Sequence, residues 1–113
     1  MGRFMYFSDG NGANLTTEAY VAEGGMIASI VPVSVTTTAV YFNKTKDTKD
    51  KIVFTHDDKT TTSGHRCKDI AKAMAQVANA GPHHTMVDMV DLDNSIFYNN
   101  LNFITGLAIT LNV

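Results

Sequence analysis

The chain has 113 residues, 44% of them hydrophobic and 18% charged, and a formal net charge of −2. This length predicts one domain over residues 1–113 with a single modest core, and it leaves no room for a second domain. The negative net charge argues against a dedicated nucleic-acid-binding protein, because Lys and Arg supply phosphate contacts, and the single cysteine excludes an intramolecular disulfide framework.

The first part of the chain is typical of short strands separated by turns. Residues 5–7 are a strand candidate, followed by a glycine-rich loop, and residues 15–23 are ambiguous. The β-branched run 26–35 contains Pro32. Because proline cannot donate to a strand ladder, we expect an edge strand, a bulge or a bend at this residue.

Two alternating segments then predict a β-hairpin. In residues 35–43, Thr38, Val40 and Phe42 share one face, and in residues 51–57 Ile52, Phe54 and His56 share one face. The charged connector 44–50 between them indicates a polar tip.

One helix is predicted at about residues 64–80. Cys67, Ile70, Met74 and Val77 recur at three- and four-residue steps and form a narrow apolar stripe. Gly81 and Pro82 follow, a pair that favours helix termination. With the strands around it, this helix predicts an α+β, mainly β fold: a small bent antiparallel sheet or barrel with one α-helix.

The last part of the chain predicts a strand at 86–93, a turn at 93–95 and an alternating strand from 101 onwards. Strict alternation places Leu101 and five further residues of this last strand on one face, and we expect the strand to pair with another strand. These residues are therefore candidates for an oligomer interface: Phe103, Thr105, Leu107, Ile109 and Leu111.

Charge is distributed unevenly along the chain. Residues 44–72 contain eight basic and five acidic residues, whereas the remainder contains one basic and six acidic residues. This pattern indicates either a solvated hairpin tip and polar helix face or a surface that faces anions, which would strengthen when copies form a ring. Tyr41, beside the lysines, is a candidate base-stacking residue or simply part of the sheet core. The candidate nucleic-acid-binding residues are Lys44, Lys46, Lys49, Lys51, Tyr41, Arg66, Lys68 and Lys72.

No complete catalytic or metal-binding motif can be assembled. The segment beginning at Asp9 lacks the ligands of a calcium loop after its third position. His56, His65, Cys67, His83 and His84 lack zinc-finger spacing. Cys67 falls in the apolar stripe, which favours an inert core thiol over a nucleophile. We therefore expect a non-enzyme with no cofactor and no metal.

No apolar run is long enough for a membrane span, and the apolar stretch near the start is too short for a signal peptide. We expect a protein that is not secreted by a signal peptide and has no membrane partner.

The segments TTTAVYFN, KIVFTHDD and GHRCKDIAKAMAQVANAGPHHTMVDMVD resemble a group of short proteins abundant in ocean metagenomes and attributed to marine cyanophages. The resemblance covers residues 35 to about 90. A member of that group is similar to Sm/LSm proteins, whose bent five-stranded sheets form rings through edge strands. The resemblance implies a homo-oligomeric ring with RNA or DNA as its candidate ligand.

The chain departs from Sm proteins in two respects. Its predicted helix falls between strands instead of before them, and it has no Arg-Gly or Lys-Gly pair, so no RNA-contact residue is carried over from that family. The alternative function is a phage virion structural protein, such as a capsid decoration, head or tail component, which pairs with a larger coat protein through the same last strand. The expected location is accordingly the host cytoplasm or the virion.

Overall fold

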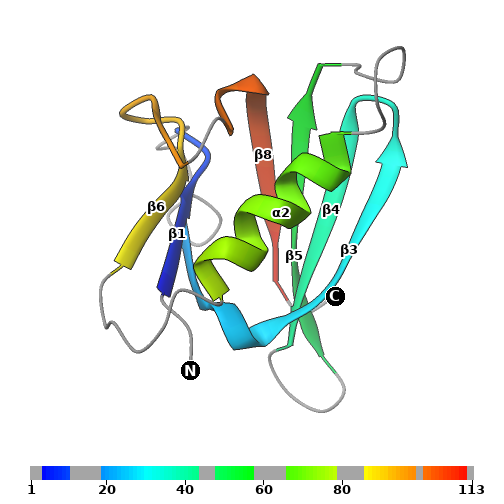
Figure 1. The fold of residues 1–113 in the computed structure, drawn as a ribbon, viewed down its shortest axis with the longest axis vertical. Coiled ribbons are helices and arrows are strands. Elements are labelled where there is room, and N and C mark those ends of the chain that lie inside the picture. Colours follow the sequence, from blue (N-terminus) through cyan, green and yellow to red (C-terminus); the bar gives the residue numbers. More distant parts are fainter. Residues whose placement is uncertain are drawn as a thin grey trace.

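The computed structural model of the protein describes residues 4–10, 19–43, 48–57, 66–78, 86–98 and 101–111. Its strands form two four-stranded sheets with one α-helix, α2, lying across them (Figure 1). The mainly β, α+β class predicted from the sequence is confirmed, and the strands described do not close into a barrel, in agreement with the bent-sheet form of the prediction.

Sheet A has the strand order β2-β1-β6-β7. Its strands are β1 (Phe4–Ser8), β2 (Ala19–Glu23), β6 (Met86–Asp91) and β7 (Ile96–Phe97). β1 pairs with β2 antiparallel but with β6 parallel. A parallel pair needs a long crossover, and here the chain from β2 through β3, β4 and β5 to α2 provides it.

Sheet B is antiparallel throughout and has the order β3-β4-β5-β8. Its strands are β3 (Ile27–Ser34), β4 (Thr37–Asn43), β5 (Lys49–His56) and β8 (Ile104–Thr110). The predicted hairpin is confirmed as β4–β5, although residues 44–47 of its tip lie outside the described residues. β3 is an edge strand, and its register shifts next to Pro32, as proline predicts.

The helix α2 spans Arg66–Ala78, within the predicted range 64–80, and the predicted stop at 81–82 lies outside the described residues. Its buried residues are Ile70, Ala73, Met74 and Val77. The 3-10 turn η1 (Gly24–Met26) lies against its last residue. A second 3-10 turn, η2 (Leu101–Phe103), precedes β8.

The two sheets face each other across one hydrophobic core. Phe7 of β1 lies 5.9 Å from Phe42 and 5.8 Å from Phe54, measured between ring centroids. Tyr20 of β2 lies 5.4 Å from Phe42 and donates a 2.7 Å hydrogen bond to Asp50 of β5. Each sheet therefore has an inner face toward this core and an outer face that points away from it.

A β-bulge changes which residues of β8 face the core. Thr55 pairs with Gly106 and His56 with Ile104, so Thr105 is an extra residue without a register partner. Ile104 and Ile109 are both buried, although strict alternation would put them on opposite faces. The prediction that Thr105 shares a face with Leu107 and Ile109 is wrong, because the bulge turns Thr105 outward.

Candidate functional site

The structure separates the candidate basic residues into two groups. Lys49 and Lys51 alternate along β5 with the buried Asp50 and Ile52, so their side chains lie on the outer face of sheet B. The remaining described members, Arg66, Lys68 and Lys72, belong to α2 on the core side of that sheet. Lys44 and Lys46 lie outside the described residues.

The outer face of sheet B places Tyr41 beside both lysines of β5. Tyr41 pairs with Lys51 across the β4–β5 ladder, and Asn43 pairs with Lys49 at the next outward position. Tyr41 and both lysines are half-buried. A base can stack on an aromatic ring while nearby cations contact the phosphates on either side of it. No described element covers Tyr41 or these two lysines.

The rest of this outer face is apolar or carries hydroxyl groups. One cross-strand row contains Val31, Ala39, Val53 and Ala108, and the row that contains Tyr41 continues to Ser29 and Thr110. Ala39 is only 1% exposed, since its methyl group lies between the larger side chains of its two neighbours. We call this whole surface, together with Tyr41, Lys49 and Lys51, the B face.

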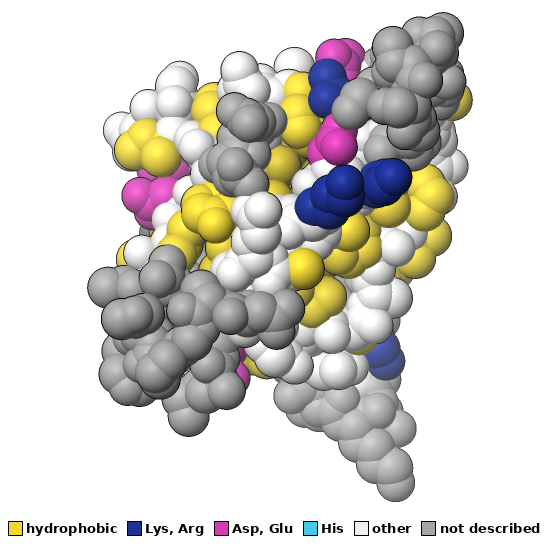
Figure 2. All heavy atoms as spheres, viewed as in Figure 1, with side chains coloured by type: hydrophobic (Ala, Val, Ile, Leu, Met, Phe, Trp, Pro, Cys, Tyr) yellow, Lys and Arg dark blue, Asp and Glu magenta, His cyan; other side chains and the backbone are white. Residues whose placement is uncertain are grey.

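The helix group forms a second, separate basic surface. Figure 2, viewed from the side on which α2 lies, shows Lys and Arg side chains gathered over the helix next to acidic ones. Lys68 and Lys72 are exposed one turn apart. Arg66 is less able than these lysines to bind an anionic ligand, because its guanidinium already donates hydrogen bonds to two carboxylates.

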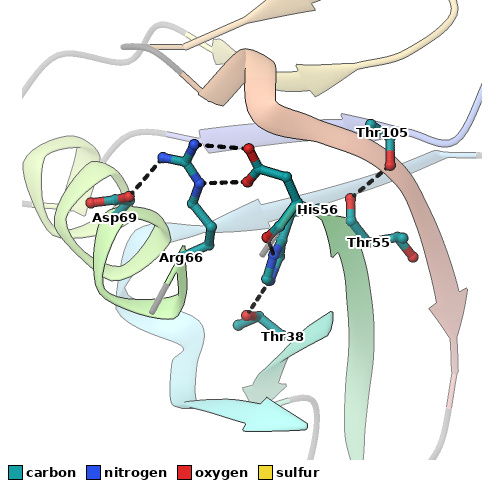
Figure 3. Close-up of polar contacts among 7 residues, drawn as sticks. Thr38, Thr55, His56, Arg66, Asp69 and Thr105 are labelled. Atoms are coloured by element: carbon teal, nitrogen blue, oxygen red, sulfur yellow. Dashed lines mark hydrogen bonds and ion pairs between the residues drawn. The ribbon is translucent and has the colours of Figure 1, made fainter. Parts of the chain in front are cut away.

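Arg66 ties the start of α2 to the end of β5. Its Nε and Nη2 donate to the two carboxylate oxygens of Asp57 at 2.7 and 3.1 Å, and its Nη1 donates to Asp69 at 3.1 Å, a contact visible in Figure 3. The guanidinium carbon also lies 4.2 Å from the ring centroid of Phe103. The hydrogen bonds that Arg66 donates to Asp57 lower the pKa of the Asp57 carboxyl. The same hydrogen bonds are the main cause of the raised pKa of Arg66.

His56 lies beneath this ion pair and has a fixed hydrogen-bonding pattern. Its Nδ1 is 2.8 Å from the carbonyl oxygen of Asp57, so Nδ1 carries the proton and donates it. Nε2 is then the acceptor for the Thr38 hydroxyl at 2.9 Å, as drawn in Figure 3. His56 is 3% exposed and Thr38 is fully buried. A substrate cannot reach either group, so this hydroxyl–imidazole pair is a structural cluster and not a catalytic one.

The remaining chemical candidates give no site within the described residues. Burial raises the pKa of the Cys67 thiol, which opposes a role as an activated nucleophile. No group of three or more His, Cys, Asp or Glu in the described ranges could hold a metal ion. His65, His83, His84 and most of the rejected calcium loop lie outside those ranges.

The five candidate interface residues of the last strand occupy different environments. Ile109 is 5% exposed and belongs to the core of its own chain, while Leu107, Leu111 and Phe103 pack partly against that core. Thr105 is exposed and donates a 3.3 Å hydrogen bond to the carbonyl oxygen of Thr55 (Figure 3). β8 pairs with β5 along one edge and is the last strand of sheet B.

Sequence reasoning missed the Thr38–His56–Arg66 arrangement as a unit. Thr38 and His56 are 18 positions apart, and their contact depends on the register between β4 and β5, which neither strand encodes by itself. The alternation of residues 51–57 places His56 on the same face as the apolar Ile52 and Phe54. This alternation is the local signal that could have indicated a buried histidine.

Comparisons with protein-family models, with curated proteins and with solved structures found no significant match for this chain. Within the described residues, no helix has both the length and the apolar character that crossing a bilayer requires.

Proposed function

We propose that this chain is a non-enzymatic, Sm-like β module of phage type, which forms a homo-oligomeric ring and binds RNA or DNA. The observation that supports nucleic acid as the ligand is the position of Tyr41 on the uncovered B face, directly opposite Lys51 and one outward position from Lys49. In this role the chain would act in the host cytoplasm.

The energetic share of each side chain follows from its chemistry. Stacking of one base on Tyr41 would contribute about 1–3 kcal/mol, and this term depends little on salt. Each lysine that neutralises a phosphate of a single strand would add about 0.7 to the slope of log affinity against log salt. Two lysines on one face therefore give a weak, salt-sensitive site on each chain.

The edge of β8 supports the ring part of the proposal. β8 is at the border of sheet B, so one of its edges has no strand partner among the described residues. Its sequence ITGLAIT contains no proline and no charged residue, the features that usually block edge pairing. The opposite border strand, β3, carries Pro32 and is less suited to it.

The test measures binding of a fluorescent single-stranded RNA and DNA by anisotropy at about 50 and about 200 mM salt. We expect Tyr41→Ala to weaken binding about five- to hundredfold at either salt concentration, and Lys51→Gln to reduce the salt slope by about 0.7. Lys72→Gln removes the same charge from α2, on the other side of the core, and is the matched control. Equal affinity for wild type and Tyr41→Ala, or no binding at the lower salt by an intact oligomer, would overturn the nucleic-acid role.

A virion structural protein is the second candidate, and the exposed valines at the end of the β3–β4 hairpin favour it. Val31 is 43% exposed, Val33 62% and Val35 50%. Val31 and Val33 lie on the edge strand β3 and Val35 in the turn that follows it, and exposed apolar side chains there suit docking to a larger coat protein. Mass spectrometry of purified particles would find this chain at high copy number if it is a virion component, and its absence from particles would exclude that role.

A further inference from the structure

The outer face of sheet A carries an exposed apolar patch with acidic residues at its border. Its two cross-strand rows are Val21–Tyr6–Asp88 and Glu23–Phe4–Met86. Phe4 is 43% exposed, Val21 48% and Met86 55%. Exposed side chains of this size that are adjacent in the register form one patch, which no described element covers. We call this surface the A face.

The A face and the B face have opposite charge. The described strands of sheet A contain acidic residues and no Lys or Arg, and Glu23 and Asp88 lie on its outer face. On the B face the charged residues are Lys49 and Lys51, because Asp50 between them is buried in the core. None of these four outward charges has an ion-pair partner among the described residues.

We infer that the A face of one copy docks on the B face of a second copy, with valines, Phe4 and Met86 at the centre and lysine–carboxylate pairs at the border. Apolar rows then meet apolar rows, and acidic residues meet basic ones. Two A faces would bring like charges together, and so would two B faces. Charge therefore selects the A-to-B contact over either symmetric one.

The fold makes this contact heterologous. Sheets A and B pack through their inner faces, so the two outer faces point away from each other and cannot meet within one chain. Each copy thus presents its A face to one neighbour and its B face to another, and repeated contacts give an open filament or a closed ring. The inference rests on the homo-oligomer part of the proposed function and does not require nucleic acid.

The size of the two faces limits the strength of the contact. Four strands about 4.8 Å apart and about 20 Å long give a face of about 400 Å². A standard stable interface buries about 800 Å² per partner. We therefore expect weak association, visible only at high protein concentration, and salt should weaken it further.

The test is a complementation experiment with two variants. Val21→Glu places a carboxylate in the A face, and Val31→Glu places one in the B face; both positions are exposed on border strands, so thermal melting should change little. Sedimentation velocity up to about 1 mM protein gives the size of each sample. Lys68→Glu, which changes charge on α2 and on neither face, is the control.

We expect each variant alone to form a smaller species than wild type, and a one-to-one mixture to form a larger species than either. The mixture has this effect because the intact B face of Val21→Glu can receive the intact A face of Val31→Glu. An oligomer whose size neither variant changes would overturn the inference and leave the ring proposal standing. A wild-type chain that is monomeric at every concentration would overturn both.

Nucleic-acid binding is measured separately. Because nucleic acid would occupy the B face, added oligonucleotide should reduce the size of the wild-type assembly.

Discussion

At the residue scale, Gly24 of η1 lies directly against the end of α2. A Cβ atom built on Gly24 would lie 2.8 Å from the Cα and 2.9 Å from the Cβ of Ala78, at the end of α2. The obstacle at this point is helix backbone, which cannot rotate away as a long side chain can. Glycine at this position therefore permits η1 and α2 to pack directly on each other.

We expect Gly24→Ala to lower the free energy of unfolding by about 1–3 kcal/mol, because the added methyl group forces the helix end away from η1. Urea denaturation followed by circular dichroism measures this change. Gly25→Ala is a matched control one residue away, since its Cβ would meet only Glu23 Oε1 at 3.6 Å. Equal losses in the two variants would show that the helix contact does not matter.

The Thr38–His56 hydrogen bond gives a second prediction at this scale. Thr38→Val keeps the shape of the side chain but removes the hydroxyl that donates to His56 Nε2, leaving a buried acceptor without its donor. We expect a loss of about 1–3 kcal/mol in the free energy of unfolding. Thr37→Val, whose hydroxyl contacts Ser34 at the surface, should change stability by less than about 0.5 kcal/mol. A loss in the control as large as that in Thr38→Val would attribute the effect to threonine removal in general.

At the element scale, the segments that were predicted correctly are those whose signal is local. The helix, the β4–β5 hairpin and the edge position of β3 follow from a period of three to four residues, a charged connector and Pro32. The division into two sheets could not be predicted, because it depends on pairing β1 with β6, about 80 positions later in the chain. Similarly, the bulge at Thr105 depends on its partner strand β5 and has no marker in the sequence of β8.

The candidate site, like the fold, could be predicted from the sequence only where its signal is local. Alternation places Tyr41 opposite to Phe42 and Lys51 opposite to Ile52 on their strands, and the structure has both on the outer face. Lys49 was predicted in the connector 44–50, but β5 begins at this residue, so it joins the same face. Their separation from Lys68 and Lys72 could not be read from the sequence, because it depends on which side of sheet B the helix packs.

The junction between β5 and α2 should respond to acid through Asp57. Its pKa is lowered in the folded chain by Arg66, so the ion pair contributes stability above the unfolded pKa of about 3.9 and loses it as pH falls through the lower folded value. We expect the urea midpoint of Asp57→Asn to lie below that of wild type at pH 6, and the difference to shrink as pH falls below about 4. Because Asp57 is exposed, added salt should also reduce the difference. A difference that stays constant down to pH 2 would mean that the charge of Asp57 is not involved.

At the scale of the whole molecule, the uneven charge of the sequence becomes a difference between two sheets. Acidic residues of sheet A and lysines of β5 lie on outer faces that point away from each other. The two sheets are held together by the apolar core, and the hydrogen bond from Tyr20 to Asp50 is a polar contact that joins them across it.

That contact gives a prediction for alkaline pH. Burial of the phenol, together with its hydrogen bond to Asp50, raises the pKa of Tyr20. Below the unfolded pKa of about 10 the neutral phenol donates to Asp50, and we expect Tyr20→Phe to lower the free energy of unfolding by about 1–3 kcal/mol. Above about pH 10 the unfolded chain releases the proton that the folded chain retains, so the wild type loses stability with rising pH while Tyr20→Phe lacks this term.

The difference between wild type and Tyr20→Phe should therefore be largest between about pH 7 and 9 and should shrink as pH rises above 10. Chemical denaturation at a series of pH values measures it, and lysine deprotonation affects both proteins equally. Tyr6→Phe, on the outer face of sheet A, is the control, since the Tyr6 hydroxyl has no hydrogen-bond partner among the described residues. If Tyr20→Phe follows the same pH dependence as wild type, the hydrogen bond between the two sheets does not contribute to holding them together, and the apolar core alone does so.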